Sequence, residues 1–324
     1  MIDRSWSAVD KLSDFYVENA TTFFTNTFLD SFKSRYYEFD RLNDKISSAS
    51  SVKDVGIVDD DKIMGMGIYY QVDYLSEYFG KEIGVLDGLV IDKKIEKIKK
   101  IEVADYLLWF IFTEIKSHYD FLSVNVPSGS IELIRVLERY GFYYAEGFNN
   151  MEGMLDNANE PLILGDTVIR GAKEGDFKKL EKIYLESNFP SHLVTDPFFD
   201  EQKAKRLYVN NFRKTWEEGN GKVWVAEVDG DFAGALIGKI DWELYQKTQI
   251  ITNARSGMGI IVNPKYRHQK VAQQLLIERD NWYKDQGVKC QILGANISNA
   301  PMIRLLEKKG FRHASATITM HKKL

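Results

Sequence analysis

Cysteine is nearly absent from this sequence, and its absence limits the chemistry. Among 324 residues only Cys290 is a cysteine. A single cysteine excludes an internal disulfide framework and a cysteine-rich zinc site. Cys290 also begins a predicted strand, 290–295, where we expect a small buried side chain rather than a nucleophile.

Long apolar runs and a strong net charge are missing as well. The longest unbroken apolar run, 106–112, is far shorter than the roughly 20 residues of a membrane helix. The first residues lack the basic start and apolar core of a secretory signal. A formal net charge of −4 gives no global attraction to nucleic acid. We therefore expect a cytoplasmic protein without nucleic-acid or membrane partners.

One stretch near the C-terminus has the clearest local pattern, SGMGIIVNPKYRHQKVA at 256–272. Its apolar part, 257–262, has the length and β-branched content of a buried strand. A polar and basic loop, 265–270, follows, and from Val271 apolar residues recur at helical spacing. A helix N-terminus offers unpaired N–H groups and a partial positive charge, so the loop suits a pyrophosphate. An ordinary strand-to-helix connection with solvated charges is the alternative.

The chain also contains an internal repeat. IELIRVLERYGF at 131–142 matches APMIRLLEKKGF at 300–311, and the offset of 169 residues also brings 121–126 onto 290–295. A repeat of this size predicts two copies of one α/β unit. The copies would be joined near 156–161.

Two motifs in this order resemble the GNAT acyl-CoA N-acyltransferases. The loop 266–272 is similar to the family's Arg/Gln-x-x-Gly-x-Gly/Ala loop: Arg267 and Ala272 match, and Lys270 stands at the central glycine. Residues 299–311 look like the second motif, an asparagine followed by a helix that ends in Glu-Lys-x-Gly-Phe. Lys270 could offset its bulk by pairing with phosphate if its backbone φ is negative.

The resemblance implies an α/β (α+β) fold of tandem GNAT-like domains, each a mixed, mostly antiparallel sheet flanked by helices. The N-terminal copy would be degenerate, because 92–102 has no family loop motif. The predicted domains are a helical N-terminal extension (1–60), a degenerate GNAT-like half (61–157) and an acetyl-CoA-binding GNAT domain (162–324). The sequence gives no function for residues 1–74.

Two further stretches resemble one branch of the family, the dTDP-fucosamine (sugar-nucleotide amine) acetyltransferase group. Residues 191–199 look like its substrate-side segment, and 75–84 like the start of its degenerate half. A tryptophan expected shortly after Tyr208 is replaced by Asn211. The acceptor contacts that this resemblance implies are His192, Asp196, Phe199 and Tyr208.

The resemblance implies acetyl-CoA as the co-substrate and no metal. Backbone N–H groups of the strand before the loop would stabilise the oxyanion of the thioester carbonyl. The residues that would hold the cofactor are Ile260, Ile261, Val262, Arg267, His268, Gln269, Lys270, Val271, Ala272 and Asn299.

Acetyl transfer to an amine needs a base or a water relay, because the amine must lose a proton. Glu227, Asp241, Glu243 and His192 are the candidates, although a lone histidine in a loop is commonly a surface residue. The family's thiolate is usually protonated by a tyrosine, but Leu306 stands at that place. Tyr283, Tyr245 or His321 could replace it, or the thiolate could leave unassisted, since a free thiol has a pKa of about 8.5.

The predicted function is N-acetyl transfer from acetyl-CoA to a primary amine by direct attack in a ternary complex, with an amino sugar on a nucleoside diphosphate as acceptor. One alternative is another GNAT acceptor, such as a peptide N-terminus, a polyamine or an antibiotic amine. Another is a catalytically decayed acyl-CoA-binding module. A homodimer is compatible with this interpretation.

Overall fold

The computed structural model describes residues 9–20, 53–59, 62–115, 118–155, 167–219, 221–240, 242, 246, 250–252 and 259–324. The chain divides into two compact units. Unit 1 is Met1–Phe148 with Ser315–Leu324, and unit 2 is Asn149–Ala314. The chain therefore passes between the units inside two long strands, β5 (Tyr143–Met154) and β12 (Arg312–Lys323).

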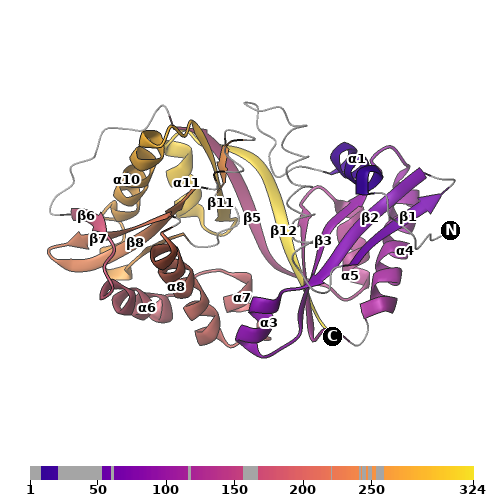
Figure 1. The fold of residues 1–324 in the computed structure, drawn as a ribbon, viewed down its shortest axis with the longest axis horizontal. Coiled ribbons are helices and arrows are strands. Elements are labelled where there is room, and N and C mark those ends of the chain that lie inside the picture. Colours follow the sequence, from indigo (N-terminus) through magenta and orange to yellow (C-terminus); the bar gives the residue numbers. More distant parts are fainter. Residues whose placement is uncertain are drawn as a thin grey trace. The chain divides into compact units, whose positions relative to one another are not determined.

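Unit 1 is a sheet with helices on both faces (Figure 1). Its strands lie in the order β1-β2-β3-β4-β12. The β3–β4 pair is parallel, and β1–β2, β2–β3 and β4–β12 are antiparallel. Its other elements are α1 (Val9–Asn19), β1 (Lys53–Asp59), β2 (Lys62–Gln71), α3 (Asp73–Phe79), β3 (Ile83–Ile91), α4 (Lys97–Ile115), β4 (Phe121–Pro127) and α5 (Ile131–Arg139).

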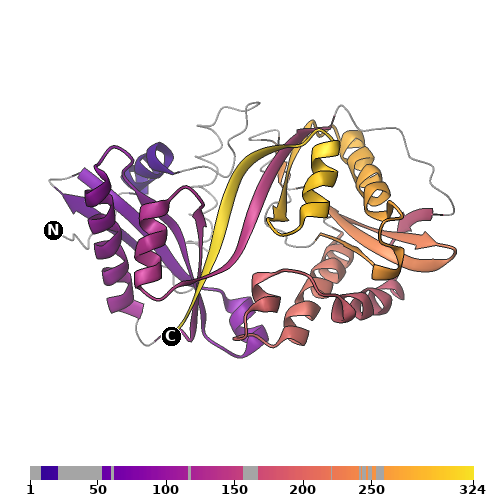
Figure 2. The same ribbon diagram turned by 180° about the vertical axis from the view of Figure 1, so that it is seen from behind.

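Strand β2 is apolar along most of its length because both of its faces are covered. Met64 and Tyr69 pack in the core under α4 and α5. Ile68 and Tyr70 belong to the core formed with α1, where Phe15 packs. Figure 2, seen from behind, shows α4 and α5 side by side on one face of this sheet.

Unit 2 contains a four-stranded antiparallel sheet in the order β10-β8-β7-β6. Helices α6 and α8 pack on one of its faces and α10 on the other. A second group of strands pairs β9 with β11 in parallel, with β5 beside β11. The elements are β6 (Thr167–Gly171), α6 (Asp176–Glu186), α7 (His192–Thr195), α8 (Glu201–Glu218), β7 (Gly221–Val228), β8 (Asp231–Lys239), β9 (Ile250–Thr252), β10 (Ile260–Val262), η1 (Pro264–Tyr266), α10 (Val271–Asp285), β11 (Cys290–Asn296) and α11 (Ala300–Lys308).

The helices and strands of the two repeat copies keep the offset found in the sequence. Strands β4 and β11, helices α5 and α11, and strands β5 and β12 are each related by the 169-residue offset. The last strand of the second copy pairs with β4 in unit 1, from Thr317↔Pro127 to Lys323↔Phe121. The last strand of the first copy lies beside β11 in unit 2. The compact units therefore do not end where the sequence copies end.

The predicted domain bounds of 61–157 and 162–324 follow the repeat, and they stay a prediction because the joint at 156–166 lies outside the described residues. Within the predicted helical extension 1–60, residues 53–59 instead form the strand β1. Val55 and Ile57 of this strand are buried and lie two residues apart, which is the period of a strand with one face in the core. The strand pairs with β2. Helix α1 is the part of the extension that forms a described helix.

Candidate functional site

Strand β10 pairs with β8 along one edge only, among the residues that the structure describes. The carbonyl of Gly259 accepts from β8 at 2.7 Å, and the N–H of Asn263 donates to β8 at 2.8 Å. Backbone groups of an antiparallel strand point alternately to its two sides. Ile260 and Val262 therefore direct their N–H and C=O groups away from β8.

In the described structure, the free edge of β10 is not hydrogen-bonded to β11. The two strands belong to different sheets of the described structure, although each precedes a helix of the same unit. An extended molecule with amide groups can pair with such an edge by backbone hydrogen bonds, as an added strand does. The edge suits a narrow, amide-containing ligand.

The loop after β10 is anchored to the hairpin that joins β7 and β8. The Tyr266 hydroxyl donates to Asp231 Oδ2 at 2.6 Å, and Lys265 Nζ lies 3.1 Å from the same oxygen. Tyr266 is buried, whereas Arg267, His268, Gln269 and Lys270 are exposed. This anchor fixes the start of the loop and leaves its basic side chains in solvent.

Lys270 has a left-handed backbone, with φ of +61°. The negative φ on which we made its phosphate pairing conditional is therefore wrong. Glycine adopts this conformation without a steric penalty, but a side chain costs about 1 kcal/mol or more. The loop thus keeps the backbone shape of the motif's central glycine although the residue is lysine.

Helix α10 begins without a side-chain cap. Its N-cap residue Lys270 makes no capping hydrogen bond, and its first turn carries no acidic residue. The first N–H groups of a helix lack intrahelical partners and carry a partial positive charge. Anion binding by Arg267 and the N–H groups of 271–273 stays a prediction, and an uncapped helix N-terminus is compatible with it.

Asn299 caps helix α11 in the same unit. Its Oδ1 accepts from the N–H of Met302 at 3.3 Å. Because the oxygen has this structural task, the donor Nδ2 is the group that could meet a ligand carbonyl.

The predicted acceptor contacts have scaffold contacts in unit 2. The Tyr208 hydroxyl hydrogen-bonds Ser191 Oγ, and its ring packs in the core of α6 and α8. Asp196 Oδ1 accepts from the N–H of Phe198 at 2.9 Å. Phe199 is buried, and His192 is half-buried at the start of α7. These contacts explain the residue types without an acceptor.

Glu227, near the end of β7, is held in an ion pair with Arg170. Its Oε1 lies 2.5 Å from Nη2 of Arg170. Nη1 of the same arginine lies 2.7 Å from Asp176 Oδ2. The hydrogen bond from Arg170 lowers the pKa of Glu227 below its ordinary value, which weakens it as a base. Glu227 lies opposite Phe232, next to the β7–β8 hairpin, whereas Ile260 lies opposite Leu236 farther along β8. Asp241 and Glu243 lie outside the described residues.

Two of the three candidate general acids, Tyr283 and His321, are fully buried, and Tyr245 lies outside the described residues. The Tyr283 side chain is fully buried, and its hydroxyl donates to the carbonyl of Lys239 at 3.0 Å. Leu306 is fully buried in a cluster with Leu293 and Phe311. The position that usually carries the family's tyrosine is therefore part of the core.

A buried charge cluster in this unit was not predicted from the sequence. Asp280 Oδ1 accepts from Nη2 of Arg279 at 2.7 Å and from Nε2 of Gln291 at 3.0 Å. The Nζ of Lys309 lies 2.9 Å from Oδ2. Asp280 lies four residues after the buried Leu276, on the inward stripe of the helix, and this spacing was the available signal.

The corresponding loop of unit 1 differs in that it contains a buried carboxylate. Asp92 is buried where β3 meets α4, accepts from the N–H of Lys94 at 2.8 Å and lies 2.6 Å from Lys62 Nζ. Burial alone raises the pKa of Asp92, but the hydrogen bonds and charges of Lys62 and Lys94 lower it overall. A fixed carboxylate here disfavours a pyrophosphate.

Among the described residues, no group of three or more His, Cys, Asp and Glu side chains could hold a metal. In the same residues, no helix is long and apolar enough to cross a membrane.

Comparison with known proteins agrees with the motifs. Residues 178–311 match the model of the acetyltransferase (GNAT) family. No curated protein sequence matches the chain.

Solved structures share the fold at low identity. A GCN5-related N-acetyltransferase from Sphaerobacter thermophilus is 16% identical with a TM-score of 0.56, over 91% of this chain and 87% of that one. One from Kribbella flavida is 10% identical with a TM-score of 0.51, over 87% and 92%. A GCN5-related glucosamine N-acetyltransferase region of a fungal multi-domain GH3 β-N-acetylglucosaminidase is 14% identical with a TM-score of 0.56, over 99% of this chain and 38% of that one. The predicted fold class is confirmed.

Proposed function

From the place of residues 178–311 in the acetyltransferase (GNAT) family, we propose that the protein transfers an acetyl group from acetyl-CoA to a primary amine. The observation that supports the proposal is that a free strand edge and an uncapped helix N-terminus follow each other along the chain. The free edge of β10 leads through the loop 263–270 to the uncapped N-terminus of α10. The amide-containing arm of acetyl-CoA would lie along the strand edge, and its pyrophosphate would lie at the helix N-terminus.

The cofactor-binding roles follow the chain. The backbone of Ile260 and Val262 would pair with the amides of the pantetheine arm, and a strand N–H would stabilise the oxyanion. Arg267 and the N–H groups of 268–272, with Ile261 behind them in the strand, complete the cradle for the diphosphate. Asn299 Nδ2 would donate to the arm from α11. Acetyl-CoA supplies the activated acyl group.

Proton transfer is assigned to water or to a residue near the acceptor rather than to Glu227. His192 and Asp241 remain the proposed bases. With Leu306 and Tyr283 both occupied in the core, departure of CoA as a thiolate is the proposed route. A free thiol has a pKa of about 8.5, so this departure needs no strong acid.

We propose an amino sugar on a nucleoside diphosphate as the acceptor. The support is the segment 191–199, which resembles the substrate side of sugar-nucleotide amine acetyltransferases, with Tyr208 behind it. The glucosamine N-acetyltransferase region among the similar folds makes an amino sugar a reasonable first test. A cytoplasmic location and a homodimer remain predictions of the same interpretation.

A decayed acyl-CoA-binding module is the second candidate function. The observation that favours it is Leu306, which fills the core where a proton donor usually stands. A peptide N-terminus, a polyamine or an antibiotic amine is the remaining alternative for the acceptor.

Release of the CoA thiol tests these proposals together. The purified chain is incubated with acetyl-CoA and, separately, a dTDP-amino sugar, glucosamine, spermidine, an aminoglycoside or a short peptide. We expect the highest kcat/KM with the nucleotide sugar. Faster turnover of another amine would replace the acceptor assignment, and acetyl-CoA binding without turnover on any amine would favour the decayed module.

A further inference from the structure

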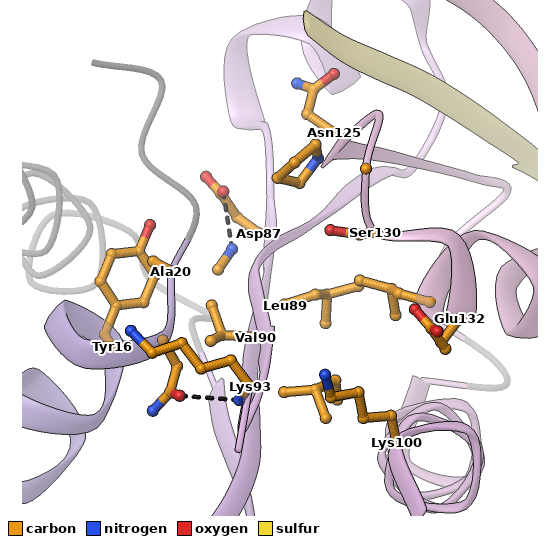
Figure 3. Close-up of a pocket in the computed structure, with 16 residues that line it drawn as sticks. Tyr16, Ala20, Asp87, Leu89, Val90, Lys93, Lys100, Asn125, Ser130 and Glu132 are labelled. Atoms are coloured by element: carbon orange, nitrogen blue, oxygen red, sulfur yellow. Dashed lines mark hydrogen bonds between the residues drawn. The ribbon is translucent and has the colours of Figure 1, made fainter. Parts of the chain in front are cut away.

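Unit 1 contains a cavity of about 190 Å³ that the proposed acetyl transfer does not use (Figure 3). It lies where β3 and β4 separate, since these strands pair only from Ile83↔Phe121 to Leu86↔Val124. Just beyond, Gly88 has a φ of +58° and the β2–β3 register shifts. This irregularity is a β-bulge, so the opening is built into the backbone.

Helix α1 forms one wall of the cavity through Tyr16, Asn19 and Ala20. The Oδ1 of Asn19 accepts from the N–H of Lys93 at 3.0 Å, and Lys93 Nζ donates to the carbonyl of Glu18 at 2.5 Å. Two bonds from one lysine thus hold α1 against the end of β3. The cavity is lined by residues of unit 1 and is partly open to solvent.

The charged groups that line the cavity balance one another. Lys93 and Lys100 contribute two positive charges, and Asp87 and Glu132 two negative ones. The side chains of Lys100 and Glu132 form no ion pair or hydrogen bond with any part of the chain that the structure describes. Ser130 stands at the N-cap of α5, but its side chain makes no capping bond. The Ser130 hydroxyl is therefore available to a ligand.

Figure 3 shows Lys100, Ser130 and Glu132 on the same side of β3 as the Leu89 side chain. Leu89, Val90 and Leu133 are buried apolar lining residues. At roughly 30 Å³ for each water in the liquid, the cavity has the volume of about six waters. The site therefore combines opposite charges, an apolar floor and room for a small molecule.

We propose that this cavity binds a small zwitterion, namely an α-amino acid with a short apolar side chain. Its carboxylate meets Lys100, the Ser130 hydroxyl and the first N–H groups of α5. Its ammonium meets Glu132, and its side chain contacts Leu89. A diphosphate is disfavoured, because the two carboxylates and Asp92 would repel it.

Isothermal titration of the full chain with L-valine tests this inference. Isovalerate and isobutylamine are the matched probes, since each keeps the apolar part and loses one charge. We expect valine to bind at least about tenfold more tightly than either, because each lost charge removes a charge-assisted contact. No heat from valine, or equal affinity for isovalerate, overturns the proposal.

Two substitutions locate the binding. Lys100→Met keeps the aliphatic stem and Glu132→Gln keeps the side-chain shape, and each should weaken valine binding about tenfold. Lys97→Ala, on the exposed start of α4, is the control and should leave it unchanged. Circular dichroism melting confirms that each variant is folded. Unchanged valine affinity in both folded site variants would place the ligand elsewhere and contradict the inference.

Discussion

Asp280 in α10 and Lys309, which follows α11, form an ion pair of 2.9 Å between side chains that are almost fully buried. The pair connects the helix whose N-terminus forms the proposed anion site to the helix that Asn299 caps. Burial alone raises the pKa of Asp280, but the charges of Arg279 and Lys309 and their hydrogen bonds lower it overall. The carboxylate therefore stays ionised in the core.

Asp280→Asn should destabilise the protein by about 3–5 kcal/mol, because it leaves Arg279 and Lys309 buried without a countercharge. Urea unfolding measures the change in the free energy of unfolding. Asp285→Asn is the control, since Asp285 is exposed at the end of the same helix, and it should change stability by less than about 0.5 kcal/mol. A loss below about 1 kcal/mol at position 280 would contradict the role of the cluster.

The stability that Asp280 contributes should depend on pH in one direction. Its pKa is lowered by folding, so the contribution is complete above the unfolded value of about 3.9 and is lost as the pH falls through the folded value. The stability difference between wild type and Asp280→Asn should therefore shrink below about pH 4. Unfolding measured from pH 7 to pH 3 tests this, and a difference that grows on acidification would exclude it.

Lys270→Gly should raise stability by up to about 1 kcal/mol, because glycine adopts φ of +61° without strain. Part of that gain is offset by the greater freedom of glycine in the unfolded chain. Lys270→Ala is the matched variant: it removes the charge but keeps the strain. Thermal unfolding compares the two, and equal stabilities would mean that the backbone at this position is not strained.

Arg267→Ala should weaken acetyl-CoA binding by about 1.5–3 kcal/mol, the value of one charge-assisted contact, with a smaller effect on the acceptor. Lys265→Ala is the control from the same loop, because the Lys265 ammonium already contacts Asp231. We expect it to have the smaller effect on the dissociation constant for acetyl-CoA. If both variants lost affinity equally, general attraction rather than a specific contact would explain the binding.

Glu227→Gln should leave kcat within a few fold and should not move the acidic limb of the pH profile for kcat/KM. The reason is that Arg170 holds the carboxylate and lowers its pKa. Steady-state thiol release between pH 5.5 and 9 is the measurement. Loss of activity together with loss of the acidic limb, in a folded variant, would restore Glu227 as the base.

Sequence periodicity predicted much of the fold correctly. Strand β11 begins at the predicted residue Cys290 and helix α10 begins at the predicted residue Val271, since apolar spacing and turn residues act locally. The exchange of β5 and β12 between the units was not predicted, because both orders of pairing satisfy the same alternation of apolar residues.

The candidate site was predicted in outline but not in its polar detail. The strand, loop and helix at 260–285 lie as the pattern indicated. Side-chain partners depend on tertiary contacts, so the sequence could not show that Arg170 binds Glu227 or that Tyr283 donates to Lys239. The residues proposed from family resemblance remain predictions that binding measurements must test.

Hydrogen exchange of the protein with and without acetyl-CoA tests the central claim most directly. We predict that the cofactor slows exchange at the N–H groups of Ile260 and Val262 and across 267–273, with no change across 88–94 of unit 1. A titration that releases no heat, with unchanged exchange across 259–273, would contradict the account.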